Sequence, residues 1–253
     1  MAGRTQSRGR FAAGLIFCLA VISFVIFIDL KLKDLLFRDD LLPVRAVVVD
    51  GALKQLEPKE IADIAGRLCA GHNIAALDTR PLQRALLQLP WTARVLVRKR
   101  MPDTLVISVV EHVPAAYWNT SGLYDARMQQ VFYPDLQRFS EPLVRLSAER
   151  DNLAPEVYNK AVHFMRALSA YNLQMTEVSL DNIRCFRIRL AGGTVLILGR
   201  DNERQVVQSR LQRFLKAQRA GSFNLNEAEY VDLRYDVGFA VKKRSQEQEQ
   251  KQE

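Results

Sequence analysis

The stretch from Phe11 to Ile28, FAAGLIFCLAVISFVIFI, contains no charged residue and no proline. Wound as a helix, it is long enough to cross the roughly 30 Å apolar core of a bilayer. A helix also satisfies its own backbone hydrogen bonds, which lipid cannot do. A buried core helix normally keeps a polar stripe, and this stretch shows none. The sequence therefore predicts a transmembrane helix over residues 11–28.

A cleaved signal peptide and a soluble helix are the two alternatives to an anchor. A signal peptide has an apolar run of about 7–15 residues, followed by a cleavage site of small residues. Here the run is longer, and it leaves through Phe27, Ile28, Asp29 and Leu30, where no such site exists. We therefore expect an uncleaved anchor that is followed by a charged linker over residues 29–43.

The orientation of the anchor depends on the Lys and Arg residues near its ends. These residues divide evenly between the two sides: Arg4, Arg8 and Arg10 before the anchor, and Lys31, Lys33 and Arg38 after it. The free amino terminus adds one positive charge before the anchor. We therefore expect residues 1–10 to form a cytoplasmic tail, and the bulk of the chain to lie outside the inner membrane in a single-pass, type II arrangement.

The composition excludes some classes of protein. Of the 253 residues, 48% are hydrophobic and 25% are charged, as in a folded protein. The net charge of +8 suggests nucleic-acid binding, but the basic residues are scattered and lack interleaved aromatic residues. We therefore expect a basic surface that meets anionic lipid headgroups or an acidic partner. Cys69 and Cys185 could pair in an oxidising compartment, but they fall in different predicted domains, which favours two buried free thiols.

A small α+β domain is predicted over residues 44–114. A β-branched strand over residues 44–50 precedes a helix opened by Pro58 and a second helix that begins near Thr79. Two alternating strands, over residues 93–98 and 104–111, complete a β-α-α-β-β order. Such a unit can form a three-stranded sheet covered by two helices.

A β-rich domain with flanking helices is predicted over residues 115–241. Short strand candidates lie at residues 117–118, 122–124, 131–133 and 143–146, and Pro155 starts a helix. A hairpin turns at Gly192-Gly193, and Asp201-Asn202 precedes a second helix. The last predicted strand runs from Tyr230 to Val241, and residues 242–253 read as a disordered tail. The predicted fold class is therefore α+β.

No catalytic, cofactor or metal site is predicted. His72, His112 and His163 lie outside any HExxH or Cys/His spacing, and the chain has no GxSxG, GxxxxGK[ST] or GxGxxG motif. We therefore expect neither an enzyme nor a small-molecule substrate. The last strand instead offers an interaction surface, since a sheet edge can accept a strand from a partner. The alternative is that this strand lies inside the sheet.

Three runs of sequence resemble a known family: VRAVVVDG (44–51), NIAALD (73–78) and LPWTARVLVRKRMPDTLVISVVEHVPAAYW (89–118). They are similar to a POTRA domain and, more narrowly, to the FtsQ/DivIB family of bacterial cell-division proteins, and the resemblance continues to about Val241. It implies a non-catalytic scaffold that holds a division complex together at the septum. A POTRA-type periplasmic chaperone or docking module and an anchored periplasmic enzyme are the alternatives.

In the family, the last strand takes up FtsB, which comes with FtsL. The stretch YVDLRYD-x-G-x-AV of this chain matches the family's motif for this docking edge. The match implies that the edge consists of Tyr230, Arg234, Tyr235, Val237, Gly238, Phe239 and Ala240. Arg234 would pair with an acidic group, and Tyr235 would supply flat apolar area. Relatives often have Ser in place of Val237, and an aromatic residue where this chain has Lys242-Lys243.

The resemblance also implies contacts with other division proteins through the POTRA domain and the membrane helix. In the POTRA domain, the edge strand for such contacts would be Val44 to Asp50 or Leu105 to Glu111.

Overall fold

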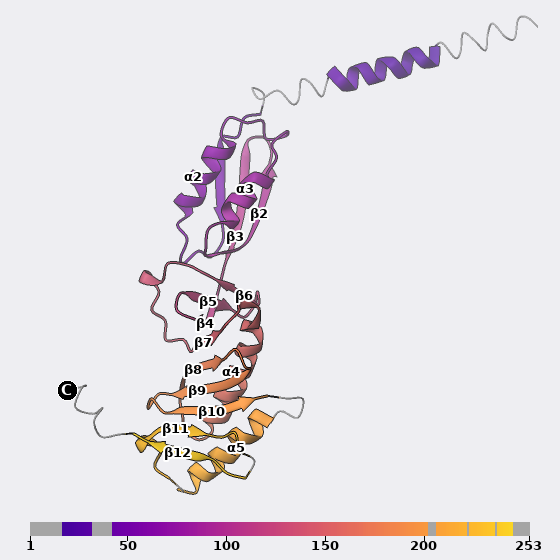
Figure 1. The fold of residues 1–253 in the computed structure, drawn as a ribbon. Helices are drawn as coiled ribbons and strands as arrows, with labels where there is room; N and C mark the ends of the chain where they lie inside the picture. The colour runs from indigo at the N-terminus through magenta and orange to yellow at the C-terminus, as the bar shows by residue number, and fades with distance from the viewer. Residues whose placement is uncertain (1–16, 32–41, 202–205, 222, 236, 245–253) are drawn as a thin grey trace, which may run out of the picture. The chain divides into compact units, whose positions relative to one another are not determined.

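The structure, a computed structural model, describes residues 17–31, 42–201, 206–221, 223–235 and 237–244 (Figure 1). The described residues divide into two compact units between Glu111 and His112. Both units combine helices with a sheet, so the α+β class is confirmed.

The described part of the amino-terminal region is a helix over residues 17–31. The predicted anchor begins at Phe11, and residues 11–16 lie outside the described residues. Within the described ranges, no helix has both the length and the apolar character needed to cross a membrane. Cys18 on this helix is exposed, whereas Cys69 and Cys185 are buried, and all three are free thiols.

The first unit has the predicted order of one strand, two helices and two strands. Its elements are β1 (Ala46–Asp50), α2 (Pro58–Cys69), α3 (Arg80–Leu87), β2 (Thr92–Arg100) and β3 (Thr104–Glu111). Each helix buries one face: Ile61, Ala65 and Cys69 on α2, and Leu82 and Leu86 on α3. These side chains share a core with the inward-facing residues of the sheet.

The strand order β1-β3-β2 corrects one expectation for the first unit. The strand of residues 105–111 was one candidate edge, but β3 lies at the centre, parallel to β1 and antiparallel to β2. The chain passes through both helices before it forms β2 and β3. This crossover allows β3 to pair with β1 in parallel. The two edges of this sheet are therefore β1 and β2.

Glu111, the last residue of β3, holds the loop that leads into α2. Its carboxylate accepts hydrogen bonds from the backbone N–H groups of Lys54 (2.9 Å), Gln55 (3.0 Å) and Leu56 (2.7 Å). The side chain thus satisfies three donors at the end of the unit where α2 begins.

The second unit is built on a nine-stranded sheet with the order β12-β11-β10-β9-β8-β7-β4-β5-β6. Its strands and helices are β4 (Pro114–Trp118), β5 (Gly122–Asp125), β6 (Gln130–Phe132), β7 (Arg145–Ala148), α4 (Ala154–Ser169), β8 (Met175–Leu180), β9 (Cys185–Leu190), β10 (Val195–Arg200), α5 (Val206–Arg219), β11 (Ala228–Asp232) and β12 (Ala240–Lys243). Helices α4 and α5 bury Phe164 and Phe214 in one core with Trp118 and Phe186 of the sheet. The predicted helix cap at Asn202 lies outside the described residues.

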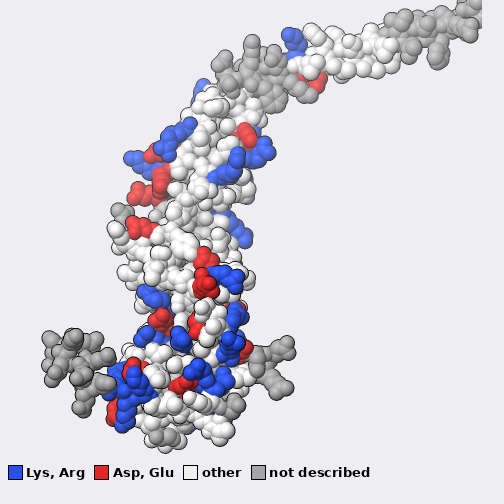
Figure 2. All heavy atoms as spheres, in the orientation of Figure 1, with Lys and Arg blue, Asp and Glu red and all other residues white. Residues whose placement is uncertain are grey.

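The opposite face of this sheet carries a row of paired side chains. Neighbouring strands place these residues in register across the sheet: Tyr117, Arg145, Glu177, Arg189, Val195, Tyr230 and Lys242. Arg189 pairs with Glu177 at 3.2 Å, and Lys242 lies over the ring of Tyr230. Figure 2 shows Lys and Arg interleaved with Asp and Glu over the strands near the carboxyl end. Most of these charges therefore neutralise one another.

Strand β8 was not predicted, and a bulge explains why. The buried residues are Met175, Val178 and Leu180, so the first spacing is three residues and the second is two. The register with β9 shifts between Met175 and Glu177. Because the bulge breaks the two-residue alternation, the pattern in the sequence does not indicate a strand.

Candidate docking edge

The carboxyl-terminal edge consists of two strands rather than one. The single strand predicted from Tyr230 to Val241 is wrong, since β11 ends at Asp232 and β12 begins at Ala240. Tyr230 lies on β11, which β10 and β12 flank on both sides. In the part of the chain that the structure describes, β12 pairs with β11 alone and forms the sheet edge. Lys242 and Lys243 belong to β12, so the predicted tail does not begin at residue 242, and residues 245–253 lie outside the described residues.

Asp232 explains why the chain leaves the sheet. Its Oδ1 accepts a hydrogen bond from the backbone N–H of Arg234 at 3.0 Å. An aspartate that binds the backbone two residues ahead forms an Asx-turn, which diverts the chain from an extended path. The preceding contact, from Leu233 N–H to the Ile197 carbonyl (2.9 Å), is the last that follows the β10 register. Residues 233–239 then connect β11 to β12.

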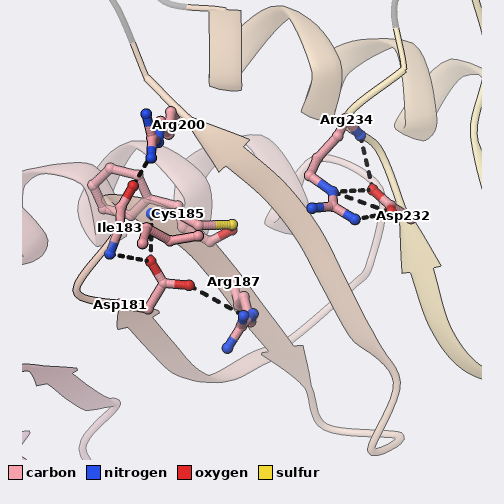
Figure 3. Close-up of polar contacts among 8 residues, drawn as sticks. Asp181, Ile183, Cys185, Arg187, Arg200, Asp232 and Arg234 are labelled. Carbon is pink, nitrogen blue, oxygen red and sulfur yellow. Dashed lines mark hydrogen bonds and ion pairs between the residues drawn. The ribbon is translucent and has the colours of Figure 1, made fainter.

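The guanidinium of Arg234 is already engaged within the chain. Its Nε and Nη2 donate to the two oxygens of Asp232 at 2.9 and 2.7 Å (Figure 3). This bond to Arg234 holds the pKa of Asp232 below its ordinary value and raises the pKa of Arg234. The side chain of Arg234 remains 55% exposed. An acidic group that reached Arg234 would therefore share it with Asp232.

Two arginines of α5 hold the connecting segment in place. Arg210 donates from Nη1 to the Leu198 carbonyl (2.9 Å) and from Nη2 to the Arg234 carbonyl (3.1 Å). Arg213 donates from Nη2 to the carbonyl of Tyr235. Neither arginine was predicted from the sequence as part of this site. Their spacing of three on a helix was the available signal, because it places both on one face.

A cavity of about 250 Å³ lies beside this segment. Its lining includes Arg200, Arg210 and Arg234 together with Cys185 and Gly199. Arg200 donates from Nε to the Ile183 carbonyl at 2.6 Å, across from the Arg234–Asp232 pair in Figure 3. Gly199 has φ +82°, and a Cβ there would lie 3.0 Å from the Arg234 side chain. Glycine thus allows Arg234 to approach, and the cavity has a cationic lining with one carboxylate nearby.

The remaining predicted site residues differ in how accessible they are. Tyr235 is 58% exposed and Val237 is 98% exposed. Gly238 is half-buried, and Ala240, the first residue of β12, is exposed. Phe239 turns inward, and its ring packs against Phe223 (5.2 Å between centroids) and Phe214 (6.1 Å). Most of the exposed apolar area therefore belongs to Tyr235 and Val237, whereas Phe239 secures the segment to the core.

Lys242 and Lys243 of β12 form ion pairs with carboxylates on β11 and just before it. Lys242 lies 2.9 Å from Glu229, and Lys243 lies 3.2 Å from Glu227. The pKa of Lys242 is raised by its bond to Glu229. These exposed pairs hold the head of Lys242 against β11 and that of Lys243 against the turn before β11. Lysines at an edge discourage indiscriminate strand pairing.

Comparison with known proteins agrees with both units. Residues 42–112 match the family model for the FtsQ-type POTRA domain, and residues 116–234 match that for the carboxyl-terminal domain of cell division protein FtsQ/DivIB. The chain is 30% identical to the cell division protein FtsQ of Nitrosospira multiformis over 208 residues, which cover 80% of this chain and 84% of the relative. It is 30% identical to the cell division protein FtsQ of Neisseria gonorrhoeae over 207 residues, which cover 81% of this chain and 82% of that relative. It is 28% identical to the cell division protein FtsQ of Aliivibrio fischeri over 246 residues, which cover 95% of this chain and 91% of that relative. The chain therefore belongs to the FtsQ/DivIB family of non-catalytic bacterial cell-division proteins.

Proposed function

We propose that this protein is a single-pass scaffold of the divisome that docks FtsB, together with FtsL, at the edge strand β12. The observation that carries the proposal is that β12 pairs with β11 on one side only, among the residues that the structure describes. An edge strand presents unpaired main-chain groups to any chain that can lie beside it. A partner strand would complete the sheet by β-augmentation.

Side chains next to β12 would select the partner. Tyr235 and Val237 supply exposed apolar area directly before the edge strand. The cationic lining formed by Arg200, Arg210 and Arg234 would attract an acidic side chain of the partner. Asp232 already neutralises part of this charge, so its contribution would be to orientation more than to affinity.

Membrane anchoring is the second part of the proposal. The uncharged stretch from Phe11 to Ile28 would cross the inner membrane, with residues 1–10 in the cytoplasm and the two units in the periplasm at the division septum. An anchor confines the search for membrane-bound partners to two dimensions and raises their effective concentration. The free edges β1 and β2 of the first unit would meet other division proteins.

Affinity capture from solubilised envelopes tests the proposal. The full chain is expected to recover small coiled-coil membrane partners, and Tyr235→Glu to lower their recovery at least about tenfold, because a charge replaces exposed apolar area at the edge. The matched control is Met165→Glu, which changes a 44% exposed apolar side chain on α4 and should leave recovery unchanged. Circular dichroism checks that both variants are folded.

Two outcomes would contradict this function. Equal recovery by the wild type and Tyr235→Glu would remove the segment before β12 from the docking site. Recovery of unfolded outer-membrane barrel proteins in place of coiled-coil partners would favour the POTRA-type chaperone.

A further inference from the structure

One end of the first unit gathers basic side chains around an exposed apolar residue. Strand β2 ends in Arg98, Lys99 and Arg100, all exposed, and the turn into β3 begins with Met101, which is 55% exposed. Arg45 lies at the same end, since its backbone N–H donates to the Asp103 carbonyl of this turn at 2.9 Å. Its side chain is also exposed. We call these four basic residues and Met101 the basic tip.

In the described residues, the basic side chains of the basic tip are not paired with carboxylates. Among the residues that the structure describes, no ion pair involves Arg45, Arg98, Lys99 or Arg100, and Lys99 donates to the Ala75 carbonyl at 3.0 Å. The nearest acid in sequence, Asp103, is half-buried and accepts a hydrogen bond from the Thr104 hydroxyl at 3.0 Å. The basic tip therefore presents a net positive charge to its surroundings.

At the opposite end of the unit, carboxylates outnumber the two lysines Lys54 and Lys59. Glu111 lies there with Asp50, which pairs with Ser108 at the far end of the sheet. Glu57 and Glu60 flank the start of α2, next to the loop that Glu111 holds. The two ends of one small unit therefore differ in sign. An anionic surface would orient such a unit with the basic tip towards it.

The basic tip is also the end at which the chain enters the unit. Val44 donates its backbone N–H to the His72 carbonyl, and the next residue binds the β2–β3 turn. Between the helix over residues 17–31 and Val44, the chain can span at most about 45 Å even when fully extended. A helix anchored in a bilayer would therefore keep the basic tip within that distance of the membrane, so that it can reach the headgroups.

We propose that the basic tip docks on the anionic phospholipid headgroups of the membrane that holds the anchor, with Met101 entering the headgroup layer. The inference rests on the proposed anchor. Each Lys or Arg near an anionic surface strengthens such binding, and one apolar side chain among them adds a shallow contact. Docking would fix the first unit beside the membrane, where spans of partner proteins emerge.

Cysteine labelling of the full chain in nanodiscs tests this docking. Met101→Cys places a thiol in the basic tip, and Lys54→Cys places a matched exposed thiol at the acidic end. A neutral, water-soluble maleimide is applied in phosphatidylcholine discs with and without phosphatidylglycerol. Phosphatidylglycerol is expected to slow labelling at position 101 about fivefold or more, and not at position 54. High salt should remove the difference, because it screens the attraction.

A charge variant makes the test specific. Arg100→Glu, combined with Met101→Cys, should restore the labelling rate in anionic discs, whereas Lys59→Glu at the acidic end should not. Equal rates at position 101 in both kinds of disc, with Cys18 shielded from the reagent, would overturn the docking while leaving the anchor intact. Labelling of Cys18 in the discs would instead overturn the anchor.

Discussion

Val241→Pro is expected to weaken partner binding about 30- to 100-fold while the protein remains folded. Lys242 and Ala240 are paired with Tyr230 and Asp232, and Arg244 donates its backbone N–H to the Glu227 carbonyl at 2.8 Å. Main-chain groups alternate in direction along a strand. The N–H of Val241 therefore points away from β11, towards the position of an added strand. Proline removes this donor and places its ring in the path of the partner.

The size of the effect follows from one carbonyl of the partner losing its bond in a desolvated interface. Leaving a buried acceptor unsatisfied costs about 1–3 kcal/mol, and steric exclusion of the partner strand adds to that. Tenfold in affinity corresponds to about 1.4 kcal/mol. An edge strand tolerates proline where its N–H faces solvent, so the β11–β12 pairing should survive.

Two measurements, each made on control variants as well, decide this prediction. Titration of the full chain with the purified partner gives the affinity, and thermal unfolding checks the fold. Val241→Ala is the matched control: it trims the same side chain, keeps the N–H, and should cost less than about fivefold. Lys242→Pro should instead damage the fold, because its N–H points towards β11. An unchanged affinity for Val241→Pro would mean that no strand is added at β12.

The first unit could be predicted from the sequence because local signals and tertiary packing agree there. The spacing of Ile61 and Ala65, with proline in the first turn, indicates one helix, and Leu82 and Leu86 indicate the next. The alternation around Val95 and Val97 indicates β2 in the same way. Strand order was not predictable, because hydrophobic periodicity does not specify which strands become neighbours. The choice between β1 and β3 as an edge therefore remained open until the structure placed β3 at the centre.

The carboxyl-terminal sheet edge was predicted only in outline. The sequence places an apolar, strand-forming segment last, and the structure has a sheet edge there. The break within this segment depends on the Asp232 side chain binding the Arg234 backbone, which competes with the strand and leaves no mark in the hydrophobic pattern. The inward turn of Phe239 depends on Phe214 and Phe223, which lie on other segments. Contacts of this kind come from the tertiary structure and cannot be read from spacing.

Removal of the Asp125 carboxylate is the second change with a large expected effect, here on the stability of the second unit. It is 1% exposed at the end of β5, and its two oxygens accept backbone N–H bonds from Val113 (3.0 Å), Arg127 (2.8 Å) and Met128 (3.1 Å). Its Oδ2 also lies 3.0 Å from Nδ1 of His112, whose ring stacks on Phe132. One carboxylate thus joins the start of the second unit to the β5–β6 turn.

Asp125→Ala is expected to destabilise the second unit by about 3 kcal/mol or more, because it leaves several buried donors without an acceptor. The measurement is urea unfolding of the full chain followed by the fluorescence of Trp118, in a Trp91→Phe background so that only the second unit reports. The control is Asp135→Ala, which removes an exposed carboxylate bound to the single N–H of Gln137 and should cost about 1 kcal/mol or less.

The pH dependence of the same variant separates a bound carboxylate from simple loss of packing. Burial alone would raise the pKa of Asp125, but the N–H bonds from Val113, Met128 and Arg127 and the contact with His112 outweigh it, so the pKa is lowered. A carboxyl with a depressed folded-state pKa contributes stability above its unfolded pKa of about 3.9, and loses it as the pH falls through the folded value. The difference in unfolding free energy between wild type and Asp125→Ala should therefore be constant near neutral pH and shrink only below about pH 4. A difference that fell away between pH 7 and pH 5 would mean that the Asp125 carboxylate does not hold these donors.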